Sequence, residues 1–337
     1  MVYMMTKRLR WIDICKGIGI VLVVLGHYMQ TIYLKYNDSI FTYIFYWIYS
    51  FHMPMFFVLS GFVYKEYEMV VFLKKKIHSL LIPVVFFSVL YTLYKIIVVQ
   101  EKISWISVLL CKSNSYIHLY WFIWALLWTE SIFFILKKII KNNYFVLLFS
   151  IIILILLMFL NCEKILLNLP FCIGNVPYLL PFYAIGVCCK DTKFYNVSYC
   201  KLGLLFSIDI FICWKYMYGI SYALLSFDNL LLDYIKAGIG ISFFVLASKA
   251  IDTNKIKFVS SCLQKIGKES LWIYLVHGFF FWGLFKKLLC FIPQNEVIIL
   301  IYILIASAVT IAIIYIEIII YRIILERFIF NVLQSEK

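Results

Sequence analysis

Charge is scarce in this chain of 337 residues, of which 14% are charged and 65% are hydrophobic. A soluble domain is about one quarter charged and about half apolar, so this composition excludes an ordinary water-soluble fold. Long polar segments are also lacking, because no stretch between apolar runs exceeds about 20 residues. The sequence therefore leaves no room for a soluble catalytic domain, and any chemistry is expected within the apolar part of the chain.

Metal-type cysteine spacing is absent as well. The 10 cysteines are scattered, most of them within apolar runs, so we expect no metal site. The net charge of +14 comes from Lys and Arg residues that fall between the apolar runs. In that position basic residues set membrane topology and contact anionic lipid headgroups. Membrane lipids are therefore expected partners, and nucleic acid is not.

Apolar runs of about 20 residues are abundant, which is the length that a helix needs to cross about 30 Å of hydrocarbon. Barrel strands of about 10 residues with alternating faces do not fit these runs. The sequence predicts an all-α fold, a polytopic transmembrane helical bundle that forms one domain over residues 1–337. About ten spans are expected, at 12–34, 40–64, 77–99, 119–137, 144–160, 173–189, 202–219, 230–250, 270–290 and 297–321.

The distribution of basic residues predicts the orientation of the bundle. Of the 31 Lys and Arg residues, 22 fall in segments on one proposed side. Cytoplasmic segments carry the excess of Lys and Arg, so both termini are expected to face the cytoplasm. Lys286 and Lys287, on a proposed outer loop, go against this trend. We expect a multi-pass protein of the plasma membrane.

The first span carries two ionisable residues, which are costly inside a membrane and therefore indicate function. Lys16 and His27 are eleven residues apart, so at about 100° per residue they share one helix face, about 16 Å apart along the axis. A cation at the cytoplasmic end suits a phosphate-bearing donor, and an imidazole near mid-membrane suits proton transfer. Alternatively, Lys16 sets topology and His27 bonds a neighbouring helix.

Several segments, in order, resemble the acyltransferase 3 family of integral membrane enzymes, which acylate sugars and cell-surface polymers. The first-helix signature of that family is a basic residue, ten residues and a histidine, matched here by Lys16 and His27. Four other segments resemble the later motifs of the family: FHMPMFFVLSGF at 51–62, KKKIHSLLIP at 74–83, YWFI at 120–123 and IGKESLWIYLVH at 266–277.

The resemblance implies an acyl-CoA donor, usually acetyl-CoA, that enters from the cytoplasm, and a central role for His27. It implies donor contacts by Lys76, with Lys75 beside it, and a site role for His277. The family often carries two arginines spaced by three before its Leu-Leu-x-Pro stretch. Lys76 and Ser79 occupy those positions here, so this chain lacks the second arginine.

Other polar residues leave two interpretations open. His52, as deep in its span as His27, is either catalytic or a packing residue. Trp121 either anchors the fourth helix at the outer interface or stacks on a sugar ring, and Glu130 either contacts substrate or histidine or pairs with another polar group. The segment 174–181, which includes Asn175, is expected to break the sixth helix and shape the acceptor entrance.

Two functions from different classes remain. The first is an O-acyltransferase that moves an acetyl group from acetyl-CoA to a carbohydrate acceptor, a cell-surface polysaccharide or lipid-linked sugar. In that reaction His27 either deprotonates the acceptor hydroxyl or carries the acyl group. The second is an exporter or flippase that moves a polysaccharide or lipid-linked glycan without acyl transfer.

Overall fold

The computed structural model describes residues 9–33, 40–100, 102, 110–111, 118–160, 162–191, 198–216, 221–227, 229–253, 257–280 and 295–335. Within these ranges the chain is helical, and its β pairing is limited to the isolated bridge between Ser221 and Ser226. The α-helices are α1 (Arg10–Tyr33), α2 (Ile40–Phe62), α3 (Met69–Lys76), α4 (Ile82–Tyr94), α6 (Trp121–Ile139), α7 (Asn143–Leu160), α8 (Glu163–Leu167), α9 (Val176–Cys188), α10 (Tyr199–Lys215), α11 (Leu230–Thr253), α12 (Lys257–Lys268), α13 (Ser270–Phe280) and α15 (Glu296–Ser335).

The predicted membrane-spanning helical bundle is confirmed. Among the described residues, seven helical segments are long and apolar enough to cross a membrane, and α13 is a shorter apolar helix. α6 and α10 also form where spans were expected. The third span begins earlier than predicted, at Met69, and α15 continues beyond residue 321 to Ser335. Residues 281–294, which include the end of the ninth expected span at 281–290, lie outside the described part.

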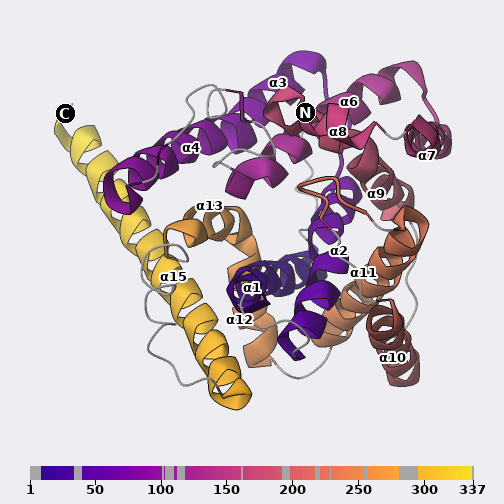
Figure 1. Ribbon diagram of the computed structural model, residues 1–337. Helices are drawn as coiled ribbons and strands as arrows, with labels where there is room; N and C mark the ends of the chain where they lie inside the picture. The colour runs from indigo at the N-terminus through magenta and orange to yellow at the C-terminus, as the bar shows by residue number, and fades with distance from the viewer. Residues whose placement is uncertain are drawn as a thin grey trace.

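α1 and α2 form the centre of the bundle, whereas α7 and α10 lie at its periphery (Figure 1). In α1 and α2, 72% of the most apolar window is buried within the protein, against 17% in α7. A helix buried on all sides tolerates polar residues only where they find partners in the protein, whereas an apolar peripheral helix faces lipid. Lys16 and His27, the two ionisable residues predicted for the first span, therefore belong to a central helix, α1.

The break in the sixth span lies earlier than predicted. The irregular turn covers Pro170–Asn175, with positive φ at Phe171 and Cys172, and α9 then runs without interruption through Pro181. Pro177 stands at the second position of α9, where its missing N–H costs no helical hydrogen bond. The prediction of a break over 174–181 was therefore wrong for the residues from Val176 onward.

α12 is a helix that the sequence analysis did not predict, and it packs extensively against α1. Two glycines allow this contact. A Cβ atom on Gly17 would lie 2.1 Å from the carbonyl oxygen of Leu263, and one on Gly267 would lie 1.7 Å from that of Asp13. Because the two backbones touch here, α12 fixes the segment of α1 that carries Lys16.

Candidate functional site

Two cavities meet at the end of the bundle where Lys74, Lys75 and Lys76 form a basic cluster. The entrance cavity, of about 540 Å³, is lined by the basic residues Lys65, Lys74, Lys75, Lys76 and His78. The deep cavity, of about 220 Å³, is lined by Lys16 and Tyr274 and mainly by apolar side chains, among them Ile20, Met53, Phe56, Phe122 and Leu126. Ser60, Val63, Lys76, Ser79 and Glu130 line both cavities and mark the passage between them.

Lys16, Lys75 and Lys76, the three predicted donor contacts, therefore all reach this pair of cavities. Lys16 lines the deep cavity, Lys75 lines the entrance cavity, and Lys76 lines both. The ammonium of Lys75 lies 3.7 Å from the ring centroid of Tyr67, another wall residue of the entrance cavity. Cations around a cleft focus field lines and raise the local concentration of an anionic ligand. The entrance cavity thus favours a negatively charged molecule.

Lys76 and Glu130 form an ion pair across the passage, with 2.5 Å between Nζ and Oε2. The Glu130 side chain is 8% exposed and that of Lys76 is 23% exposed. A π-helical turn at Ile77–Leu81 follows Lys76 immediately, and Pro83 follows that turn. Proline removes a helical N–H, and π turns occur often at functional sites. The turn presents Ser79, which stands where the family carries its second arginine, to the same passage.

Tyr64 lies just beyond the end of α2, in the wall of the entrance cavity. Burial, with a smaller contribution from the Glu66 carboxylate, raises the pKa of the Tyr64 phenol to about 12. The hydroxyl therefore stays neutral at physiological pH, so it can donate a hydrogen bond to an anion in the cavity.

Beyond the deep cavity, two predicted histidines come together. The ring centroids of His27 on α1 and His277 on α13 are 5.1 Å apart, with 34° between their planes. Tyr274, on the same face of α13, lines the deep cavity, and its ring centroid lies 5.6 Å from that of His277. His27 itself is not among the lining residues. Along α1 the order is therefore cation (Lys16), cavity wall (Ile20) and imidazole (His27), and along α13 the cavity-wall residue Tyr274 precedes the imidazole of His277.

Tyr49 of α2 lies beside His27, with ring centroids 6.5 Å apart. Gly26 makes room for it, since a Cβ atom at Gly26 would lie 3.0 Å from Tyr49 Cε2. The Tyr49 hydroxyl donates a hydrogen bond to Gln30 Oε1 at 3.2 Å. The sequence analysis missed both Tyr49 and Tyr274. Their sequence signal is the i, i+3 spacing that places Tyr49 with His52 and Tyr274 with His277 on shared helix faces.

His52 also lies beside Tyr49, and their ring centroids are 4.8 Å apart. Its Nδ1 donates a hydrogen bond to the carbonyl oxygen of Ile48 at 2.7 Å. His52 is 4% exposed and is not among the residues that line the two cavities. The described contacts of His52 are thus with Tyr49 and with the backbone of its own helix, as a packing residue would make.

The three residues predicted to bind the acceptor have different surroundings. Glu130 belongs to the donor side, paired with Lys76. Asn175 is fully buried, and its amide donates hydrogen bonds to the carbonyl oxygens of Tyr222 at 2.6 Å and Ala223 at 3.2 Å, so its amide hydrogens bind backbone instead of sugar. Trp121 is 8% exposed within the protein, so it is a buried residue and not an exposed interface anchor.

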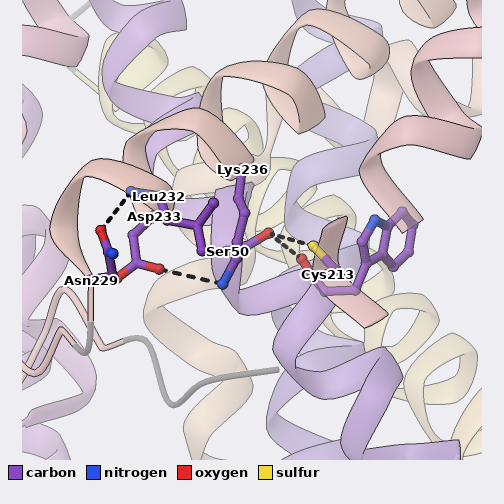
Figure 2. Close-up of polar contacts among 7 residues, drawn as sticks. Ser50, Cys213, Asn229, Leu232, Asp233 and Lys236 are labelled. Atoms are coloured by element: carbon purple, nitrogen blue, oxygen red, sulfur yellow. Dashed lines mark hydrogen bonds and ion pairs between the residues drawn. The ribbon is translucent and has the colours of Figure 1, made fainter. Parts of the chain in front are cut away.

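A second polar cluster joins α2, α10 and α11 (Figure 2). Lys236 Nζ lies 3.4 Å from Asp233 Oδ1, and both side chains are almost completely buried. Ser50 lies beside Cys213, with 3.9 Å between Oγ and Sγ (Figure 2). Asp209 of α10 accepts a hydrogen bond of 2.6 Å from the indole of Trp47. The eighth span, α11, thus carries Asp233 and Lys236 inside the bundle and paired.

A cation-lined double cavity inside an apolar helical bundle, with an imidazole pair beyond it, is typical of a membrane-embedded enzyme that accepts an anionic substrate. Known proteins show which enzyme class this is. The profile of the family described as "Acyltransferase domain" matches residues 9–322, nearly the whole chain. The chain belongs to this family, acyltransferase 3, and is an integral membrane acyltransferase.

Two relatives carry the name Nodulation protein NolL. That of Mesorhizobium japonicum is 27% identical over 306 residues, covering 79% of this chain and 74% of the relative. That of Sinorhizobium fredii is 31% identical over 126 residues, covering 34% of this chain and 33% of the relative. No solved structure matches the chain.

Proposed function

We propose that this acyltransferase moves an acetyl group from cytoplasmic acetyl-CoA to a hydroxyl of a cell-surface or lipid-linked sugar, in the plasma membrane. The observation that carries the proposal is the shared passage at Lys76 and Glu130. It connects a basic cavity, which suits the phosphates of CoA, to an apolar cavity that leads toward the histidine pair. Lysine is a flexible cation that binds phosphate well.

The apolar deep cavity suits the uncharged part of the donor. The pantetheine arm and the acetyl thioester would lie along Met53, Phe56 and Leu126, with the phosphates held by Lys75 and Lys76 and supported by Lys16. Tyr274 stands at the end of this path, between the cavity and His277. The thioester therefore passes the Tyr274 ring to reach the imidazoles, which requires a side-chain movement in the bound state.

His27 is the residue at which transfer takes place. It either accepts the proton of the sugar hydroxyl or carries the acyl group between donor and acceptor. In both routes the C–S bond of the thioester breaks, a C–O ester bond forms, and CoA leaves as the thiol. Loss of a single acid–base residue costs about 10²–10⁴-fold in rate, so His27→Ala should nearly abolish transfer.

The test is mass spectrometry of the cell-surface glycan from strains that carry wild-type protein, no protein, or His27→Ala at matched membrane abundance. The proposal expects acetylated glycan only in the first strain and normal export of polymer in all three. Fully acetylated glycan in the His27→Ala strain would refute the role of His27. Polymer trapped inside the cell without the protein would instead favour the exporter.

The donor is tested separately with isolated membranes and acetyl-CoA labelled in the acetyl group. Label should enter the glycan fraction only with wild-type protein, and unlabelled acetyl-CoA should compete with it. If an unphosphorylated acetyl thioester served equally well, the basic entrance cavity would not be the donor site.

A further inference from the structure

The His277 ring is held in one protonation form by the backbone of its own helix. Nδ1 lies 2.7 Å from the carbonyl oxygen of Tyr274. A carbonyl oxygen only accepts hydrogen bonds, so the ring proton is on Nδ1. In the neutral imidazole the other nitrogen, Nε2, then carries the lone pair and is the basic atom.

That basic nitrogen is buried without a partner. His277 is 1% exposed, and within the described part of the chain its Nε2 has no hydrogen-bond partner. A buried polar atom left unpaired is destabilising, so such an atom in a folded protein calls for an explanation. His27 supplies one, because its ring centroid is 5.1 Å away, too close for a third side chain to lie between the rings.

We propose that His277 is the proton acceptor for His27, with the Tyr274 carbonyl as the group that orients it. The inference rests on the proposed function and deepens it. The arrangement follows the general pattern of an activated residue, a neighbouring base and a third group that fixes the base. His277 acts on the substrate through His27, and the order Tyr274, His277, His27 runs from the donor cavity toward the reacting group.

The proton balance holds in both routes of transfer. In the direct route, the sugar hydroxyl gives its proton to one nitrogen of His27 while the other nitrogen passes its proton to His277 Nε2, and the sugar oxygen forms the C–O bond as the C–S bond breaks. The departing thiolate then takes the proton from His277, and CoA leaves as the thiol. In the covalent route, His27 attacks the thioester and loses its ring proton to His277 Nε2 as the C–N bond forms and the C–S bond breaks. The departing thiolate then takes the proton from His277, so CoA leaves as the thiol and the His277 ring returns to its starting form. In the second half the sugar hydroxyl attacks the acyl group and gives its proton to His277 Nε2. As the C–O bond forms and the C–N bond breaks, His277 returns this proton to the freed nitrogen of His27.

His52 provides an internal comparison. It makes the same kind of bond, from Nδ1 to the Ile48 carbonyl oxygen at 2.7 Å, so its ring is held in the same tautomer. Its ring neighbour, however, is Tyr49, which also lies beside His27. The tautomer alone therefore does not distinguish the two histidines, and the choice of His277 rests on the 5.1 Å between its ring centroid and that of His27.

The experiment compares His277→Asn with His52→Asn in membranes supplied with labelled acetyl-CoA and acceptor glycan. Asparagine keeps a side-chain N–H near the backbone carbonyl but has no basic nitrogen. We expect His277→Asn to lower kcat by about 10²–10⁴-fold, the usual cost of losing one acid–base group, with little change in the KM for acetyl-CoA. His52→Asn should lower kcat far less.

A second variant separates proton transfer from folding. His277→Ala should regain part of its activity when imidazole is added, because a free base then occupies the vacated space. Wild-type turnover by His277→Asn, or a His277→Ala variant that binds acetyl-CoA normally but gains nothing from imidazole, would overturn the inference. If wild-type membranes fail to transfer acetyl from acetyl-CoA, the proposed function fails instead, so the two failures are distinguishable.

Discussion

Lys76 and Glu130 are bound to each other across the passage between the two cavities, at 2.5 Å. The cation best placed to bind a donor phosphate is therefore already paired with a carboxylate. A phosphate carries more charge than a carboxylate and accepts strong charge-assisted hydrogen bonds. We expect donor binding to displace Glu130 from Lys76, with Lys16, which also lines the deep cavity, as the next cation for the carboxylate.

Replacing Lys76 should weaken donor binding. Lys76→Met removes the charge and keeps the length of the side chain. A hydrogen bond to a charged group is worth about 1.5–3 kcal/mol, so the KM for acetyl-CoA should rise about 10- to 100-fold. The matched control is Lys138→Met, since Lys138 lies on α6 but outside both cavities. Equal KM values for both variants would remove Lys76 from the donor site.

Replacing Glu130 should have the opposite effect on the KM for acetyl-CoA. Glu130→Gln removes the carboxylate that competes with phosphate for Lys76, so the KM for acetyl-CoA should stay constant or fall. Release of CoA should slow, because no Glu130 carboxylate then competes with the CoA phosphate for Lys76. Steady-state kinetics with CoA as product inhibitor measures both effects. A KM that rises as in Lys76→Met would show that Glu130 holds Lys76 in place and is not displaced.

The helices could be predicted from the sequence because an apolar run of about 20 residues has few alternatives in a membrane. α12 could not. It has 12 residues with both apolar and basic positions, below the length of a span, and it is held by contacts at Gly17 and Gly267 that depend on which helices become neighbours. A glycine in the sequence does not identify the backbone that it will touch.

The site could likewise be predicted only in part. The spacing of Lys16 and His27 on one helix face follows from helix geometry, and α1 is continuous over both. The pairing of Lys76 with Glu130 and of His27 with His277 joins residues that are far apart in the chain, so it depends on tertiary packing. Asn175 was predicted to be a site residue because it lies next to a helix break. In the structure its amide instead donates hydrogen bonds to backbone carbonyl oxygens.

Gly26 controls the surroundings of His27. An alanine Cβ there would lie 3.0 Å from Tyr49 Cε2 and 3.3 Å from Ile48 Cγ2, so the Tyr49 ring must shift. We expect Gly26→Ala to lower kcat for acetyl transfer about tenfold, since small misplacements at a reacting group have large effects on rate. The KM for acetyl-CoA should not change. Gly238→Ala is the control, because nothing lies within 4 Å of that position.

Gly267 tests the contact between α12 and α1. A Cβ atom there would lie 1.7 Å from the Asp13 carbonyl oxygen, a backbone atom that cannot rotate away. Gly267→Ala should therefore separate the helices, move Lys16, and lower both the unfolding temperature in detergent and the affinity for acetyl-CoA. Overpacking of this kind costs about 1–3 kcal/mol. Gly238→Ala, in an open helical position, should instead be neutral or stabilising by up to about 1 kcal/mol. Equal unfolding temperatures would contradict the close contact.

The pair of Asp233 and Lys236 should contribute to stability and not to turnover (Figure 2). Removing one partner of a buried ion pair leaves an uncompensated charge and costs about 3–5 kcal/mol. Lys236→Met should therefore lower the unfolding temperature markedly, and the double variant Asp233→Asn, Lys236→Met should recover most of the loss, since it leaves no net charge behind. Lys201→Met, at an exposed position of α10, is the control. Acetyl transfer per folded molecule should match wild type in all of these variants. A stable Lys236→Met protein without transfer activity would instead place the pair in the reaction.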